Sequence, residues 1–190
     1  KNLTKKIEEY KKILPKDYKH YKRVNFDEPF RIFLSLVFHR LDNFQKNKKG
    51  YKYFREFLDD LLLFQNSVLQ IFGTKIQNTE LDNFIAFVHQ FEFHGVSLDI
   101  RQNSSVINSE LGSEYSDFEK LIKDIPELQK IYGDRVFNSI ILSMTSSEDD
   151  VLNLFKICKK YIPKENIPSI TPLIEEIEEL QKSHIILQKL

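Results

Sequence analysis

The sequence predicts a helix-rich α/β fold, in which residues 1–94 are helical and residues 95–190 alternate between strands and helices. Three observations predict it. Apolar residues recur every three or four positions through the first region, as they do on one face of a helix. The second region contains three short apolar runs that are typical of strands. Helix-forming sequence separates these runs, and crossovers of that length are what parallel strands require.

Four helices are predicted in the first region, and each has one apolar face. The first ends at Pro15, and Asp27 is the expected N-cap of the second, with Glu28 and Pro29 in its first turn. The third ends at Gly73, because glycine tolerates a left-handed helix end. In chain order, the expected apolar faces contain Ile7, Tyr10, Ile13 and Leu14; Phe30, Phe33, Leu34, Val37, Phe38 and Leu41; Phe54, Phe57, Leu58, Leu61, Leu62, Val68, Leu69 and Phe72; and Leu81, Phe84, Ile85, Val88 and Phe91.

The fourth helix is predicted to start at Thr79-Glu80-Leu81-Asp82, a capping-box variant with Asp in place of Glu. Gly95 then leads the chain into the first predicted strand, residues 96–102. Apolar and polar residues alternate along this strand, which favours a half-buried position in a sheet.

The second and third strands are predicted at residues 137–144 and 169–174. Residues 147–150 can cap the helix that follows the second strand, and Cys158 on that helix is expected to be a small buried apolar residue. The helix after the third strand carries Ile177, Leu180, His184 and Leu187 at helical spacing.

Charged residues follow the first and third strands at their carboxyl ends. Because these ends of parallel strands meet at one edge of a sheet, we expect Arg101 and Glu175 to converge there, with Asp99 on the same strand as Arg101. Three parallel strands leave two edges exposed, and a closed barrel of eight needs five more. The sequence therefore predicts part of a (β/α)8 barrel with an N-terminal helical bundle region, as a single structural unit truncated at both ends.

Composition excludes several function classes. Lys plus Arg and Asp plus Glu both number 28, so the formal net charge is zero and a nucleic acid or an anionic membrane is not an expected partner. A single cysteine excludes an internal disulfide framework and a multi-cysteine zinc site. No apolar run approaches the roughly 20 residues of a membrane span, so we expect a soluble, cytoplasmic protein.

One motif resembles a known family. The run Leu98-Asp99-Ile100-Arg101-Gln102-Asn103-Ser104 closely resembles the LDIRQES motif of phosphoenolpyruvate carboxylases, with Asn103 in place of the usual Glu. Two further matches follow in the same order. Residues 141–144 with residues 150–152 are similar to the family's ISMxxxxSDVL segment, and residues 172–175 are similar to its PLFET segment.

The resemblance extends upstream of that motif. Residues 27–31 resemble the EPYR helix start of the family, and residues 57–63 resemble its helix rich in aspartate and leucine. Together the matches cover roughly residues 27–184. Such an ordered set is more specific than any one motif.

The resemblance implies a lyase that joins bicarbonate to phosphoenolpyruvate and yields oxaloacetate and phosphate, with Mg2+ or Mn2+ as its ion and a homotetrameric assembly. It implies substrate binding for Arg101, one of two metal-holding carboxylates for Glu175, and support from Asp99 and Gln102. No residue is assigned as a catalytic acid or base. The family's TAHPTE histidine motif does not occur in these residues, and its second metal carboxylate and glycine-rich GRGG loop are expected beyond Leu190.

Departures from the family leave two functional hypotheses. Val106 and Ile107 stand where the family usually has Arg-His, and Asn103 replaces an acidic residue. One carboxylate and one arginine are too few to hold a hard cation and two anionic substrates. The first hypothesis is a fragment of phosphoenolpyruvate carboxylase that is inactive and metal-free by itself. The second is a non-catalytic helical interaction module derived from the same fold.

The two charged residues also have structural interpretations. Arg101 could form an ion pair with Asp99 or a neighbouring carboxylate, and Glu175 could be an acidic residue favoured at a helix N-terminus. If the chain is a fragment, surfaces that the remainder would cover are exposed. We therefore expect the chain to self-associate.

Overall fold

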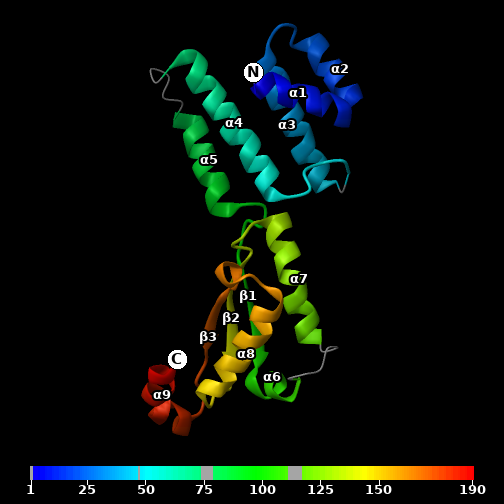
Figure 1. Ribbon diagram of the computed structural model, residues 1–190. Coiled ribbons are helices and arrows are strands. Elements are labelled where there is room, and N and C mark those ends of the chain that lie inside the picture. The colour runs from blue at the N-terminus through cyan, green and yellow to red at the C-terminus, as the bar shows by residue number, and fades with distance from the viewer. Residues whose placement is uncertain (1, 47, 74–78, 111–116) are drawn as a thin grey trace. The chain divides into compact units, whose positions relative to one another are not determined.

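The computed structural model describes residues 2–46, 48–73, 79–110 and 117–190. It divides into two compact units, Lys1–Phe93 and His94–Leu190 (Figure 1). Each unit has its own apolar core. We describe the units separately. That the two regions form one structural unit truncated at both ends stays a prediction.

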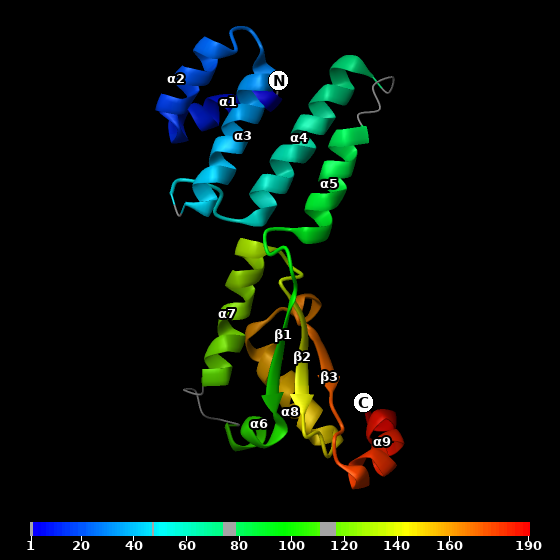
Figure 2. The same ribbon diagram turned by 180° about the vertical axis from the view of Figure 1, so that it is seen from behind.

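In its described residues, the first unit contains helices and no strand. Its helices are α1 (Asn2–Ile13), α2 (Pro15–Val24), α3 (Pro29–Gln45), α4 (Phe54–Phe72) and α5 (Thr79–Phe91). Helices α4 and α5 lie side by side as a hairpin (Figures 1 and 2). The buried residues at the centre of the unit are Leu3, Ile7, Tyr10, Leu14, Ile32, Phe33, Leu36, Val37, Tyr51, Phe54, Phe57, Leu58, Leu61, Phe64, Ile85 and Val88.

Helix boundaries follow the sequence signals in part. Gly73 ends α4 with a φ of 69°, as predicted from its tolerance of left-handed backbone. The prediction that Asp27 caps α3 is wrong, because Glu28 occupies the N-cap position and Asp27 is itself left-handed with a φ of 57°. The chain also resumes as helix α2 directly at Pro15, since proline fits the first position of a helix. The cap predicted at Thr79 involves a side chain outside the described part of the structure.

Some residues of the predicted apolar faces are exposed. Phe84 is 45% exposed, Phe38 69% and Ile13 40%, so they do not belong to the core. Among the described side chains of α5, only Ile85 and Val88 are buried, because one side of a helix can pack against its neighbours while flanking apolar residues remain outside.

The second unit alternates strands and helices in the predicted order. Its elements are β1 (Leu98–Asn103), α6 (Ser104–Glu110), α7 (Asp117–Tyr132), β2 (Phe137–Ser143), α8 (Glu148–Tyr161), the short 3-10 helix η1 (Lys164–Asn166), β3 (Ser169–Pro172) and α9 (Ile177–Lys189). The strands form one parallel sheet in the order β1-β2-β3. The predicted helix-rich α/β fold with three parallel strands is confirmed, and the sheet is open.

Helices α7 and α8 cover one face of this sheet (Figures 1 and 2). Ile140 and Leu142 of β2 are completely buried on this side, in the same core as Ile122 and Leu154 of the two helices. Alternate residues of a strand point to opposite faces. Asp99 and Arg101, on either side of the buried Ile100, therefore lie on the opposite face, where both are exposed.

The capping signal of α8 is confirmed. The carboxylate of Asp150 accepts the backbone N–H of Ser147 at 3.0 Å and that of Ser146 at 2.8 Å. Cys158, farther along α8, is fully buried, and burial raises the pKa of its thiol to about 12. This cysteine therefore behaves as the predicted small core residue.

Other boundaries of this unit differ from the prediction. Strand β1 begins at Leu98 rather than residue 96, and β3 ends at Pro172, since the ring nitrogen of proline cannot continue a ladder. Helix α9 buries Ile186 and leaves the predicted apolar residues Ile177, Leu180 and Leu187 exposed. None of the helices in the described residues combines the length and the apolar character that a membrane span requires.

Candidate functional site at the strand ends

The carboxyl edge of the sheet brings Arg101 and Glu175 into contact. Arg101 lies on β1 and Glu175 follows β3, and these two strands flank β2. The Arg101 Nη2 atom donates to Glu175 Oε1 at 2.9 Å. The two side chains are 59% and 33% exposed, so the pair faces solvent. Residues 74 positions apart therefore meet at the predicted edge.

The backbone of Met144, just after β2, is held from two sides. Its N–H donates to Glu175 Oε2 at 3.1 Å, and its carbonyl accepts the Ser104 hydroxyl at 2.6 Å. Met144 has a φ of 56°, a left-handed conformation that is uncommon for a residue with a side chain. Sequence reasoning gave no role to Ser104 or Met144, although both stand inside segments that resemble family motifs.

Asp99 contacts β2 rather than Arg101. Its Oδ1 atom accepts the Ser139 hydroxyl at 2.7 Å and the Asn138 amide at 3.2 Å. These hydrogen bonds from Ser139 and Asn138 lower the pKa of Asp99, so the carboxylate stays ionised. Asp99 therefore ties β1 to β2 one step below Arg101.

Gln102 bonds locally. Its Oε1 atom accepts the backbone N–H of Asn103 at 2.9 Å, and its carbonyl accepts the Ser143 hydroxyl at 3.3 Å. None of these hydrogen bonds of Asp99 and Gln102 involves the Arg101 guanidinium. The supporting roles predicted for the two residues stay predictions.

The departures from the family motif have local structural reasons. Asn103 precedes α6, and its Oδ1 accepts the backbone N–H of Ser105 at 2.9 Å. An asparagine suits this N-cap position, where a glutamate is not among the preferred residues. Ile107 is completely buried in the core of the second unit, where a charged side chain would be costly. Both substitutions thus favour the packing and start of α6.

The residues present do not complete a metal site. Within residues 2–46, 48–73, 79–110 and 117–190, no three His, Cys, Asp or Glu side chains are grouped so that they could hold an ion. Both oxygens of Glu175 already accept hydrogen bonds, from Arg101 and from Met144. A hard cation takes about six oxygen ligands, so one such carboxylate does not fit it alone.

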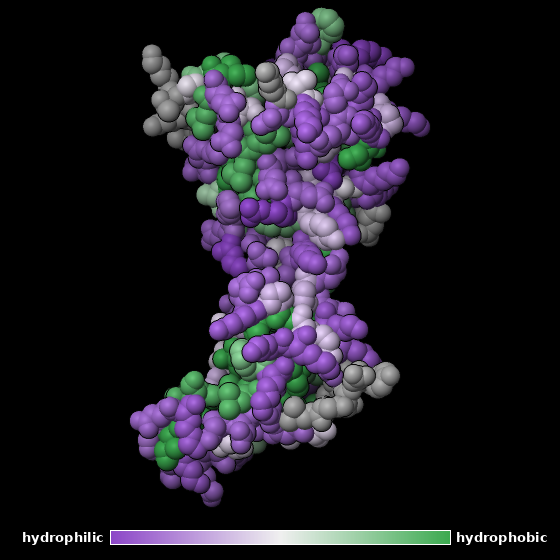
Figure 3. Space-filling view, viewed as in Figure 1, coloured by the Kyte–Doolittle hydropathy of each residue, from purple (hydrophilic) through white to green (hydrophobic). Residues whose placement is uncertain are grey.

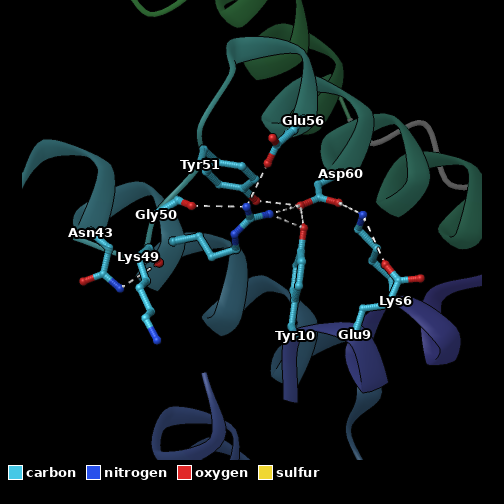
Figure 4. Close-up of polar contacts among 10 residues, drawn as sticks. Lys6, Glu9, Tyr10, Asn43, Lys49, Gly50, Tyr51, Glu56 and Asp60 are labelled. Carbon is cyan, nitrogen blue, oxygen red and sulfur yellow. Dashed lines mark hydrogen bonds and ion pairs between the residues drawn. The ribbon is translucent and has the colours of Figure 1, made fainter. Parts of the chain in front are cut away.

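A second charged cluster lies inside the helical unit (Figure 4). Sequence reasoning did not predict it. Asp60 is 1% exposed and accepts the hydroxyls of Tyr10 and, at 2.6 Å, of Tyr51. The Arg40 guanidinium donates to Tyr10 at 2.8 Å and to Glu56 at 2.8 Å.

Burial dominates the electrostatics of this cluster. It raises the pKa of Asp60, although the two tyrosine hydroxyls act in the opposite direction. It also raises the pKa of Tyr10 and of Tyr51, and the carboxylate of Asp60 adds to both shifts. The tyrosines therefore stay protonated and donate, and the cluster joins α1, α3 and α4 through polar contacts.

Comparison with known proteins identifies the family. The sequence pattern of the phosphoenolpyruvate carboxylase family matches residues 1–113 and 107–190. A phosphoenolpyruvate carboxylase of Trichormus variabilis is 26% identical over 225 residues, which cover 86% of this chain and 22% of that protein. One of Thermosynechococcus vestitus is 25% identical over 256 residues, which cover 100% of this chain and 25% of that protein. One of Prochlorococcus marinus is 26% identical over 187 residues, which cover 74% of this chain and 19% of that protein.

The chain thus spans about a quarter of the length of the curated relatives it matches, or less. The aligned region of 256 residues is also longer than this chain of 190, so the Thermosynechococcus protein has residues with no counterpart here. The two matched stretches overlap at residues 107–113, after β1. Because they jointly cover the whole sequence, this chain belongs to the phosphoenolpyruvate carboxylase family.

Proposed function

We propose that this chain supplies part of the substrate site of a phosphoenolpyruvate carboxylase, the lyase that joins bicarbonate to phosphoenolpyruvate and yields oxaloacetate and phosphate. The observation that carries the proposal is the contact between Arg101 and Glu175 at the carboxyl edge of a parallel sheet. Functional residues of (β/α)8 barrels gather at this edge. Family membership supports the proposal that this edge binds substrate.

Arg101 is the proposed ligand of the phosphate group. Its guanidinium is more than half exposed, and its planar pairs of N–H donors match the oxygens of a phosphate. The ion pair with Glu175 faces solvent, where such pairs contribute about 0–1 kcal/mol. Displacing Glu175 from Arg101 therefore costs a phosphate dianion little free energy. Asp99 and Gln102 would support Arg101 by fixing the strand that carries it.

Glu175 is the proposed contribution of this chain to the ion site. In the whole enzyme it would be one of two carboxylates around Mg2+ or Mn2+, and the ion would supply a positive charge beside the substrate. The second carboxylate has to come from outside these 190 residues. We therefore expect the isolated chain to be inactive and free of metal. For the whole protein, a cytoplasmic homotetramer is the corresponding proposal.

A titration of the isolated chain with phosphoenolpyruvate, followed by NMR of the backbone amides, tests the role of Arg101. We expect weak, saturable shifts at the carboxyl ends of β1 and β2, which Arg101→Gln removes. Glu175→Gln should strengthen binding because it frees the guanidinium. Arg55→Gln, at an exposed arginine of the helical unit, is the matched control and should change nothing.

Two results would contradict the proposal. Shifts that persist in Arg101→Gln would place the anion elsewhere. An unchanged affinity in Glu175→Gln would mean that the ion pair does not compete with the substrate. A calorimetric titration with Mg2+ alone adds a separate check, since tight binding to this chain would disprove the incomplete ion site.

A non-catalytic interaction module is the alternative function. It is favoured by Val106 and the buried Ile107, which stand where the family usually has Arg-His, and by the pairing of Arg101 within the chain. The reading frame that encodes the chain distinguishes the enzyme from the interaction module. A histidine motif upstream and a glycine-rich loop downstream would exclude the module, whereas their absence would exclude the enzyme.

A further inference from the structure

Helix α2 borders a surface hollow with an apolar floor and a cationic rim. The hollow has a volume of about 560 Å³ and lies within the helical unit. Its floor includes Tyr18 and Phe26, and Phe26 is 76% exposed. The residues that surround this floor, called here the basic rim, are Lys11, Lys19, Lys22 and Arg23.

The positive charge of the basic rim is concentrated and poorly neutralised. Residues 1–26 contain nine Lys or Arg and three Asp or Glu, although the whole chain has no net charge. Lys11 pairs with Glu8 at 3.0 Å. In the described part of the chain, no carboxylate lies within 4.0 Å of the other three rim residues, Lys19, Lys22 and Arg23. An occupant that is both anionic and apolar would therefore complement this surface.

One helix supplies most of the hollow, so the hollow has no facing wall. Every lining residue except Lys11 belongs to α2 or follows it within two positions. The other side of α2 packs against α3, where Asp17 lies 3.3 Å from a ring nitrogen of His39. Helix α2 itself lies at the edge of the helical unit, on the side away from α5 (Figures 1 and 2). Pockets for small molecules usually enclose most of the ligand, so this open face suits an extended surface better.

The side chains of the hollow favour a lipid surface over a protein surface. Lysine is depleted in protein–protein interfaces, because its ammonium group is strongly hydrated. At a bilayer, lysine and arginine keep their charged ends among the head groups while aromatic rings enter the apolar boundary. Lys11 and Lys22 already place their Nζ atoms 5.4 and 5.9 Å from the centroid of the Tyr18 ring. Figure 3 shows mostly purple hydrophilic side chains over α2, with a few green hydrophobic ones among them.

We propose that the basic hollow of α2 docks the helical unit onto an anionic lipid bilayer. Phe26 would enter the boundary between head groups and acyl chains, and the basic rim would contact lipid phosphates. The net charge of the whole chain predicted no such partner. However, charge–surface attraction is screened beyond about 10 Å in 0.1 M salt, so the local charge of residues 1–26 governs the contact.

Co-sedimentation of the chain with vesicles tests the contact. We expect binding to an equimolar mixture of phosphatidylglycerol and phosphatidylcholine, and little binding to phosphatidylcholine alone. Lys19→Glu with Lys22→Glu should lower the partition coefficient at least about tenfold, which corresponds to about 1.4 kcal/mol. Phe26→Ser should lower it at least about fivefold, because the bilayer no longer receives an apolar ring. High salt should weaken binding of the unmodified chain, since exposed charges are screened.

Matched controls make the same changes elsewhere in the helical unit. Lys48→Glu with Lys49→Glu alters two exposed lysines that do not line the hollow. Phe87→Ser alters a phenylalanine of α5 that is 56% exposed. Neither control should change the partition coefficient by more than about twofold, and circular dichroism checks that every variant is folded.

A fluorescent reporter gives the decisive measurement. The chain has no tryptophan, so Phe26→Trp introduces a single indole at the hollow. Its emission should shift to shorter wavelength with the anionic vesicles, and brominated acyl chains should quench it. Phe87→Trp on α5 is the control and should not respond.

Several results would overturn the proposal. They are equal binding to the two kinds of vesicle, binding that survives both the charge reversal and Phe26→Ser, and losses of the same size in the controls. A hollow that instead takes an acidic segment of a protein would leave the fluorescence of Phe26→Trp unchanged by vesicles. That result would also exclude the bilayer.

Discussion

Each unit holds an arginine beside a carboxylate, but in opposite surroundings. In the helical unit, Arg40 and Asp60 are 7% and 1% exposed, whereas Arg101 and Glu175 in the strand unit are 59% and 33% exposed. A buried charge that loses its partner is strongly destabilising, and an exposed pair contributes little. The buried pair of the helical unit therefore stabilises the fold. The exposed pair of the strand unit leaves its charges available to a ligand.

Removing the buried carboxylate should give the largest effect. Asp60→Ala leaves two tyrosine hydroxyls without their acceptor and removes the buried carboxylate that lies 3.9 Å from the Arg40 guanidinium, so we expect the free energy of unfolding to fall by about 3–5 kcal/mol. Urea unfolding followed by circular dichroism measures it. Asp59→Ala is the control, because the Asp59 side chain is 62% exposed and should change stability by at most about 0.5 kcal/mol. Equal effects at the two positions would contradict the importance of burial.

One donor of the cluster can be removed alone. Tyr51→Phe deletes the hydroxyl that donates to Asp60 at 2.6 Å, and we expect a loss of about 1–3 kcal/mol. The half-buried neighbour Tyr53 provides the control Tyr53→Phe. Chemical denaturation of both variants would show whether the loss is specific. A Tyr51→Phe variant as stable as the unmodified chain would mean that Tyr10 satisfies the carboxylate alone.

The cluster should also make stability depend on pH. Burial raises the pKa of Asp60, so the folded protein retains this proton at pH values where the unfolded chain has lost it. The free energy of unfolding should therefore fall as the pH rises from the unfolded pKa, about 3.9, through the raised folded pKa. Comparing the pH profiles of the unmodified chain and Asp60→Asn isolates this contribution. A profile that rises in this window relative to Asp60→Asn would contradict the assigned direction.

The cap of α6 should have a smaller effect in the strand unit. Asn103→Ala removes the acceptor of the Ser105 N–H and should cost about 1 kcal/mol, measured as faster hydrogen exchange in α6. Asn103→Asp keeps the acceptor and is the control. Asn103→Glu, which restores the usual family residue, should cap less well than Asp. Exchange that is unaffected in Asn103→Ala would remove the local explanation for this departure.

The exposed pair should give the smallest change. Arg101→Gln is expected to lower the free energy of unfolding by less than about 1 kcal/mol. The difference should shrink further in about 1 M salt, where screening acts over roughly 3 Å. A loss comparable to that of Asp60→Ala would show that Arg101 is chiefly a structural residue and would weaken its assignment to substrate.

Sequence reasoning predicted the strand unit better than the interior of the helical unit. Parallel strands place their ends at one edge whatever their packing partners are, so the meeting of Arg101 and Glu175 followed from the pattern alone. The metal and substrate roles of these residues came from the family resemblance and stay proposals. The contacts of Met144 depend on a left-handed turn that no periodicity reveals.

The Asp60 cluster could not be predicted because its members come from separate helices. Asp59 and Asp60 are adjacent and identical in type, yet one is exposed and the other buried, and only the packing of α1 and α3 against α4 decides which. Tyr10 was expected on an apolar face, where its hydroxyl gave no sign of a distant acceptor. Amphipathic spacing predicts which side of a helix is buried but not which polar groups meet there.

The turn at Met144 has an entropic consequence for any ligand of the sheet edge. Its amide donates to Glu175, which follows β3, and its carbonyl accepts a hydrogen bond from Ser104, which follows β1. These two segments lie on either side of β2. The conformational freedom of this backbone is thus lost during folding rather than during binding. A ligand that arrives at Arg101 meets a preorganised rim, so more of its contact energy appears as affinity.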